Sequence, residues 1–267
     1  GWGGDVNTMN VLSQPISEHR KSISVSMPGF GSSPEPSDNW GTWDYVEAIY
    51  KWLDMMKFKK VDIISHSFGG RVAIGLAYRY PDCANQMILI GSAGLVLPKS
   101  PKIRAKLFAA KSINRIGKML GDDINKKLQA RKQKMGSADW LAASPTMRRI
   151  LGRVIREDLS VEISQIRAKT LLLWGSEDDA VPVKLAKRMN ELIKESKLTI
   201  LPGAGHYPFL DQTGNAINEI WDWLELPSVW LCSYISLPNL HPACQENSHI
   251  GIKKRFILFP QFNNFQY

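Results

Sequence analysis

The chain has 267 residues, of which 44% are hydrophobic and 22% are charged, and its formal net charge is +9. These proportions predict a soluble globular protein. No apolar run approaches the roughly 18 residues of a membrane-spanning helix, so we expect no such helix. The three cysteines, Cys83, Cys232 and Cys244, have neither metal-ligand spacing nor the even number of a disulfide framework. We therefore expect a reducing, cytoplasmic location.

The first part of the chain alternates apolar runs with amphipathic stretches. Ile23–Ser26 is predicted to be a strand. Thr42–Phe58 is predicted to be a helix, because its apolar residues recur every three or four positions. A second strand begins at Val61, and a third is predicted at Met87–Gly91. This alternation is typical of a parallel sheet flanked by helices.

A compact motif around Ser67 joins the second predicted strand to the next helix. Its sequence is Ser65-His66-Ser67-Phe68-Gly69-Gly70, which has the layout of a nucleophile elbow, a sharp strand-to-helix turn that exposes a serine hydroxyl. Ser65 takes the place of the first glycine in the usual G-x-S-x-G pattern. The alternative is an ordinary Ser/Gly-rich turn. We expect His66 to be structural, because the turn directs the residue before the nucleophile away from the pocket.

Between Ser92 and about Ile163 the alternation stops, and the sequence is helical in composition and strongly basic. Residues 95–160 contain sixteen lysines and arginines against five aspartates and glutamates, a balance of +11, so the rest of the chain sums to −2. Such a surface either attracts anionic substrates and acidic lipids or, the favoured interpretation, keeps the outer faces of amphipathic helices solvated. No nucleic-acid-binding motif accompanies the charge, so we expect no nucleic-acid partner.

Two later strands are predicted at Thr170–Trp174 and Leu198–Leu201, and each is followed by a loop with candidate catalytic residues. Acidic residues occupy positions 177–179 after the first, and His206 follows the second. Because parallel strands end at one edge of the sheet, these side chains are expected to converge on the elbow. The order of nucleophile, acid and histidine also suits the elbow motif. Taken singly, the acidic turn could be solvated and the histidine could bond to backbone.

Together these motifs resemble the α/β-hydrolase fold family, in particular bacterial esterase-like members with a helical cap. The resemblance covers roughly residues 1 to 225 and implies a mostly parallel sheet flanked by helices, with the basic segment inserted as the cap. Its motifs are Pro28–Ser32, the elbow, Trp174–Asp178 and Gly203–His206.

The resemblance also implies the roles of the site residues. Ser67 is the expected nucleophile and His206 the base. Asp178 is favoured over its acidic neighbours Glu177 and Asp179, because it lies three residues after Gly175 as the family motif requires. The backbone N–H groups of Phe68 and Trp2 are the expected oxyanion hole.

The start of the chain departs from the family pattern. Gly1–Asp5 looks like the end of a His-Gly-Trp-Gly-Gly motif, and the first three strands of the family would precede it. The third of these lies inside the sheet, between the Ile23–Ser26 strand and the elbow strand. An empty place there would leave buried backbone groups unpaired. Three explanations are open: the neighbouring strands close against each other, another segment fills the place, or the chain is a fragment of a longer product. We favour the fragment.

The predicted domain organisation has four segments. The hydrolase core comprises residues 1–94 and 164–226, the basic helical cap comprises residues 95–163, and residues 227–267 form a C-terminal tail unlike the family. The tail shows no steady periodicity, so poor order is expected. A strand that repairs the sheet is a less favoured alternative.

We therefore expect a carboxylesterase-like serine hydrolase that cleaves esters of small or medium acyl chains through an acyl-enzyme on Ser67. The chemistry needs no metal and no organic cofactor. A small-molecule ester is the expected partner, contact of the cap with a membrane surface is less favoured, and the oligomeric state is not predicted. The alternatives are a carbon–carbon bond hydrolase of aromatic-ring breakdown, a lysophospholipase, and a non-catalytic binding protein or inactive fragment on the same scaffold.

Overall fold

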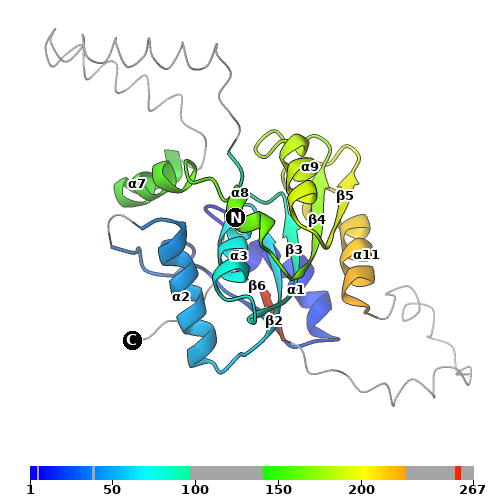
Figure 1. Ribbon diagram of the computed structural model, residues 1–267, viewed down its shortest axis with the longest axis horizontal. Coiled ribbons are helices and arrows are strands. Elements are labelled where there is room, and N and C mark those ends of the chain that lie inside the picture. The colour runs from blue at the N-terminus through cyan, green and yellow to red at the C-terminus, as the bar shows by residue number, and fades with distance from the viewer. Residues whose placement is uncertain (5, 38–39, 97–140, 227–255, 260–267) are drawn as a thin grey trace, which may run out of the picture.

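The computed structural model describes residues 1–4, 6–37, 40–96, 141–226 and 256–259, in which helices and strands alternate along the chain (Figure 1). The helices are η1 (Val6–Met9), α1 (Asn10–Ser17), α2 (Thr42–Met55), α3 (Phe68–Arg79), α7 (Pro145–Val154), α8 (Ser160–Ser164), α9 (Val183–Leu192), α10 (Pro208–Asp211) and α11 (Thr213–Leu224). The strands are β1 (Ser22–Ser24), β2 (Val61–His66), β3 (Ala84–Ile90), β4 (Lys169–Gly175), β5 (Ser196–Leu201) and β6 (Phe256–Phe259).

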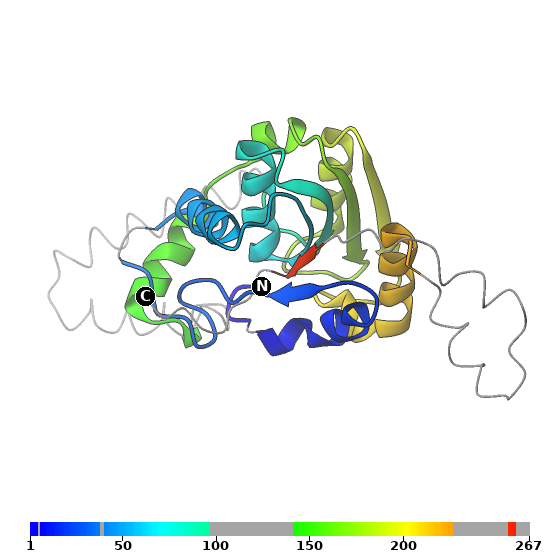
Figure 2. The same ribbon diagram turned by 90° about the horizontal axis from the view of Figure 1, so that it is seen from below.

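The described strands form one sheet in the order β1-β6-β2-β3-β4-β5, and every neighbouring pair is parallel. Helices cover both faces: α1 and α11 lie on one side, and α2, α3 and α9 lie on the other (Figure 2). The predicted fold class, a mostly parallel sheet flanked by helices, is therefore confirmed.

Strand β2 shows why the sheet needs helices on both faces. All six of its residues are buried, and successive side chains point to opposite faces of a strand. Ile63 packs into the apolar cluster under α2 and α3, whereas Ile64 packs into the cluster under α1 and α11. A nearly continuous apolar run is what a central parallel strand requires.

The C-terminal strand β6 occupies the interior place between β1 and β2 (Figure 2). Ile257 pairs with Ser22 and Asp62, and Leu258 pairs with Ile23 and Ile63. The side chains of Ile257 and Leu258 are 0% and 2% exposed and join opposite apolar clusters. The structure thus follows the alternative in which another segment fills the place, and the described strands pair continuously from β1 to β5. The rest of the predicted tail lies outside the described residues.

Two predicted elements are shorter than expected, for local reasons. Helix α2 ends at Met55 because Lys57 adopts a left-handed conformation, with φ of 59°, and the N–H of Phe58 bonds back to the carbonyl of Leu53 at 2.9 Å. This closure satisfies a terminal helix carbonyl. Strand β1 spans only Ser22–Ser24, which are the three residues that pair with β6.

The two connections to the predicted cap are tied to each other and to α3. The N–H of Leu159 donates to the carbonyl of Gly94 at 2.9 Å, and the N–H of Val96 donates to Asp158 at 2.8 Å. The buried guanidinium of Arg71, on α3, donates to the carbonyl of Glu157 at 2.7 Å. Residues 97–140 of the predicted cap lie outside the described residues.

Helix α7 is amphipathic. Its buried residues are Met147, Ile150 and Val154, which pack on the core, whereas Arg149 and Arg153 are exposed. Within the described ranges, no helix combines the length and apolarity needed to cross a membrane.

Candidate active site

The turn between β2 and α3 holds Ser67 in a strained backbone conformation. Its φ is 51° and its ψ is −114°, a combination that costs a non-glycine residue about 1–3 kcal/mol. The end of β3 supports the turn: the N–H of Ser67 donates to the carbonyl of Ile90, and the N–H of Ala93 donates to the carbonyl of Ser67, both at 3.0 Å. Glycine is required at position 70, because a Cβ there would lie 2.0 Å from Oγ of Ser92. The local geometry is that of the predicted elbow.

Ser67, His206 and Asp178 form a continuous hydrogen-bonded chain. Nε2 of His206 lies 3.0 Å from Oγ of Ser67, and Nδ1 of His206 lies 2.9 Å from Oδ2 of Asp178. An ionised carboxylate only accepts hydrogen bonds, so Nδ1 carries the proton and Nε2 is left to accept the serine hydroxyl. The structure brings together the three residues that the sequence places on three separate loops.

Burial separates Asp178 from its two acidic neighbours. The side chain of Asp178 is 0% exposed, and its second oxygen accepts a hydrogen bond from the N–H of Val181 at 2.7 Å. Glu177 and Asp179 are exposed. The spacing from Gly175 therefore identified the acidic residue that contacts the histidine.

Two glycines allow the strand ends to approach the histidine loop. A Cβ on Gly175, at the end of β4, would lie 2.2 Å from the carbonyl oxygens of Ala204 and Gly205. Gly91 follows β3 with φ of 48°, and a Cβ there would lie 3.2 Å from both Oδ2 of Asp178 and Nδ1 of His206. A larger residue at either position would displace the histidine or its carboxylate.

The residues of the predicted oxyanion hole lie beside the nucleophile. The indole ring of Trp2 meets the ring of Phe68 edge to face, with centroids 5.1 Å apart, and both residues are buried. A Cβ on Gly1 would lie 3.6 Å from Cβ of Ser67, so the chain before Trp2 passes the serine. That the N–H groups of Trp2 and Phe68 bind an oxyanion stays a prediction.

A cleft of about 500 Å³ opens next to Ser67 and His206, with Gly1 and Tyr207 in its lining. The cleft is lined by residues 1–4 and by Tyr207, which follows His206 in sequence. Among the described residues that line the cleft, Glu35 has the only charged side chain. The lining residues are Gly1, Trp2, Gly3, Gly4, Thr8, Gly29, Phe30, Glu35, Ala142, Ala143, Ser144, Met147 and Tyr207.

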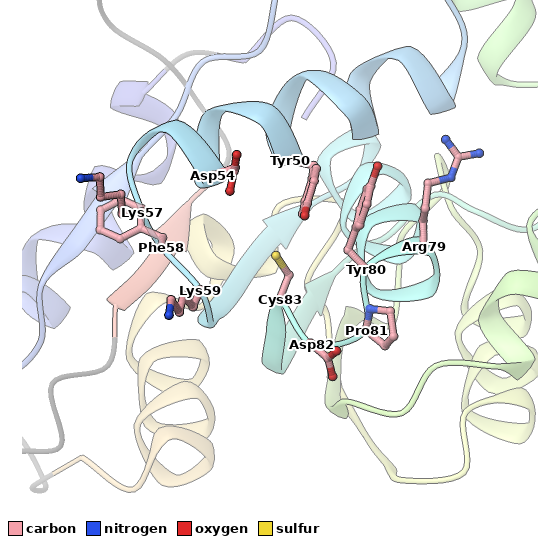
Figure 3. Close-up of a pocket in the computed structure, with 10 residues that line it drawn as sticks. All are labelled: Tyr50, Asp54, Lys57, Phe58, Lys59, Arg79, Tyr80, Pro81, Asp82 and Cys83. Atoms are coloured by element: carbon pink, nitrogen blue, oxygen red, sulfur yellow. The ribbon is translucent and has the colours of Figure 1, made fainter.

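A second cavity of about 500 Å³ lies at the opposite edge of the sheet, where β2 and β3 begin (Figure 3). The rings of Tyr50 and Tyr80 stack there, with centroids 3.5 Å apart. Cys83 is the nearest nucleophile, but burial raises the pKa of its thiol, and Asp54 acts in the same direction. A protonated thiol is a weak nucleophile. The cleft beside Ser67 is therefore the candidate active site.

The sequence did not single out Glu35 and Tyr207 as cleft residues. Tyr207 directly follows His206, the predicted base, and this adjacency could have indicated that it lies at the cleft. Glu35 has no such signal, because it reaches the cleft only through the path of an irregular loop. Among the described residues, no three His, Cys, Asp or Glu side chains are grouped to hold a metal ion, and the independence from metals stays a prediction.

The chain is similar in sequence and fold to known hydrolases. The model of a family described as alpha/beta hydrolase fold matches residues 1–213. The 2-hydroxy-6-oxo-2,4-heptadienoate hydrolase of Pseudomonas putida is 24% identical over 223 residues, which cover 78% of this chain and 80% of that protein. The pimeloyl-[acyl-carrier protein] methyl ester esterase of Shewanella woodyi is 26% identical over 240 residues, which cover 84% and 91% of the two chains.

A similar arrangement of elements occurs in a solved structure, an esterase from Exiguobacterium antarcticum. The TM-score is 0.66 at 18% identity, and the match covers 84% of this chain and 89% of that one. At this identity the likeness concerns the fold alone.

Proposed function

Because the chain belongs to the α/β-hydrolase fold family, we propose that it is a serine hydrolase that cleaves carboxylic esters of small or medium acyl chains. The observation that carries this proposal is the hydrogen-bonded chain from Oγ of Ser67 through His206 to the buried carboxylate of Asp178. A serine hydroxyl is a weak nucleophile unless an adjacent base takes its proton. His206 is within reach to do so, and Asp178 stabilises the imidazolium that results.

The first half of the reaction forms an acyl-enzyme. Oγ of Ser67 bonds to the ester carbonyl carbon while its proton moves to Nε2 of His206. The carbonyl oxygen becomes an oxyanion held by the N–H groups of Phe68 and Trp2, and one such donor typically contributes about 3–4 kcal/mol to the transition state. When the intermediate collapses, the bond to the alcohol oxygen breaks and His206 protonates that oxygen.

The second half releases the acid. His206 takes a proton from a water molecule, whose oxygen attacks the acyl carbon. The bond to Oγ of Ser67 then breaks, and the proton returns from His206 to the serine. The net reaction consumes one ester and one water and yields one alcohol and one acid, so no metal, cofactor or external oxidant enters the balance.

The test is a series of p-nitrophenyl esters of increasing acyl length, assayed with the wild-type protein and with Ser67→Ala. We expect Ser67→Ala to lower kcat by roughly 10⁴-fold or more and to abolish labelling by a fluorophosphonate probe. Ser17→Ala removes an exposed serine hydroxyl and is the matched control. Equal turnover by Ser67→Ala and the wild type at every acyl length would contradict the proposal.

A carbon–carbon bond hydrolase is the second candidate, and the similarity to the heptadienoate hydrolase of Pseudomonas putida favours it. A dienoate substrate carries a carboxylate. Among the described side chains that line the cleft, the carboxylate of Glu35 is the only charged group, and it repels a carboxylate substrate, which favours an uncharged ester. Faster turnover of 2-hydroxy-6-oxo-2,4-heptadienoate than of p-nitrophenyl butyrate would reverse this preference.

A further inference from the structure

His66 is a buried imidazole that the proposed reaction does not use. It is the last residue of β2, directly before Ser67, and it is 2% exposed. Its Nε2 lies 2.8 Å from the backbone carbonyl oxygen of His206. A carbonyl oxygen only accepts hydrogen bonds, so Nε2 of His66 carries the proton and donates it. Nδ1 is therefore unprotonated, and it has no hydrogen-bond partner among the described residues.

The surroundings of His66 keep this ring neutral. Burial lowers the pKa of His66 well below its ordinary value, and the positive charges of the Gly1 amino group and of a protonated His206 act in the same direction. The ring centroid of His66 lies 4.7 Å from those of His206 and Tyr207 and 5.3 Å from that of Phe209. A neutral ring with one N–H and fixed neighbours has a single donor direction, which is toward the carbonyl of His206.

We propose that His66 is a positioning residue that fixes the base relative to the nucleophile; this inference rests on the proposed function. Ser67 follows His66 directly, and His206 lies 140 residues further along the chain. The bond from Nε2 of His66 to the carbonyl of His206 therefore ties the strand that ends in the nucleophile to the loop that carries the base. Asp178 holds the ring of His206 at Nδ1, whereas His66 holds its main chain.

The same ring also contacts the loop of the predicted oxyanion hole. A Cβ on Gly1 would lie 2.8 Å from Nδ1 of His66, so the imidazole fills the space against which this loop packs. One side chain thus bonds to the backbone of His206 and lies against Gly1, the residue before Trp2. A misplacement of about 1 Å at such a site can lower the rate by about 10²-fold.

The test compares the loss of the donor with its replacement. His66→Phe keeps a ring and removes the N–H, whereas the amide of His66→Gln places an N–H near the position of Nε2. We expect His66→Phe to lower kcat for a p-nitrophenyl ester by roughly 10–100-fold with KM within about twofold. His66→Gln should recover most of kcat. His19→Gln, at a histidine whose ring meets that of Trp221 edge to face and which does not line the cleft, is the control for the exchange itself.

A purely structural role gives a different pattern. In that case the Phe and Gln variants would lose kcat alike, or both would change KM and kcat together, and the inference would be overturned. All assays are run well below the unfolding temperature of each variant, and His66→Leu replaces His66→Phe if the latter does not fold. Inactive Ser67→Ala with an unaffected His66→Phe would reject the positioning role alone, whereas active Ser67→Ala would reject the proposed function.

The wild-type protein provides a test that needs no variant. Two-dimensional ¹H–¹⁵N spectra distinguish the two neutral tautomers of a histidine ring. We expect the Nε2–H tautomer of His66 at all pH values between about 6 and 8, the range in which an ordinary histidine titrates. An Nδ1–H tautomer, or a ring that becomes protonated in this range, would remove the bond to His206 and overturn the inference.

Discussion

The place of β6 inside the sheet can be tested with a single truncation, Leu258→Ala. Leu258 is 2% exposed and packs in the larger apolar cluster, between β1 and β2. Removing a buried leucine side chain typically lowers the free energy of unfolding by about 2–5 kcal/mol, because apolar contacts are lost and a cavity remains. For a chain of this size, each kcal/mol corresponds to about 2–4 °C in Tm. Leu258→Ala should therefore lower Tm by roughly 4–20 °C.

The assay is thermal unfolding followed by circular dichroism, with Leu210→Ala as the matched control. Leu210 is 49% exposed, so the same chemical change should alter Tm by about 1–2 °C at most. A chain that ends at Leu226 lacks β6 and should be less stable than Leu258→Ala, since β1 and β2 then also lose their backbone partners. Equal Tm values for Leu258→Ala and Leu210→Ala would refute the reasoning and return residues 256–259 to the surface.

Four further results are expected. Asp178→Asn should lower kcat by roughly 10³-fold or more with little change in KM, because the imidazole loses its orienting carboxylate. Arg20→Met removes the cation that lies 2.9 Å from the buried carboxylate of Asp62, whose remaining partner is the amide of Asn85. This change should lower the free energy of unfolding by about 3–5 kcal/mol in urea titrations. Glu35→Gln should raise kcat/KM for p-nitrophenyl hemisuccinate, relative to p-nitrophenyl butyrate, about twofold. The reason is that two carboxylates roughly 8 Å apart in water repel each other by about 0.5 kcal/mol. The pKa of His66 is lower in the folded than in the unfolded chain, so the unfolded chain binds a proton more readily at this ring. The stability from the neutral ring is present above about pH 6.5, and below that pH the free energy of unfolding falls by about 1.4 kcal/mol per pH unit. His66→Gln should lack this pH-dependent loss of stability.

Exposed counterparts serve as controls for Asp178→Asn and Arg20→Met. Glu177→Gln changes an exposed neighbour of Asp178 and should leave kcat within about twofold. Arg188→Met breaks an exposed pair with Glu191 and should cost at most about 1 kcal/mol. If Arg188→Met destabilised the protein as much as Arg20→Met, burial of the Asp62 pair would not be the cause.

The sequence was sufficient for features that depend on short stretches of chain. The helix and strand alternation follows from the spacing of apolar residues, and the elbow follows from small residues on both sides of Ser67. The assignment of Asp178 over Glu177 and Asp179 followed from the resemblance, since the family motif places the acid three residues after Gly175. Each of these signals lies within one loop or one element, so no knowledge of distant residues was needed.

The filling of the sheet required the tertiary structure. Phe256–Phe259 is a short apolar run that fits a strand or a buried helix segment equally well. Its role depends on an interior place between β1 and β2, which are separated from it by about two hundred residues. Unpaired backbone groups at that place can be satisfied by any apolar strand that reaches it. No local sequence pattern predicts which segment will do so.

What the sequence determined by itself was the set of candidate catalytic residues and the loops that carry them, because parallel strands all end at one edge of the sheet. What the tertiary structure decided was how those groups are held: the donation from His66 to the carbonyl of His206, the burial of Asp178, and the approach of Glu35 to the cleft. These depend on distances between loops far apart in the chain, and packing of the whole core sets those distances.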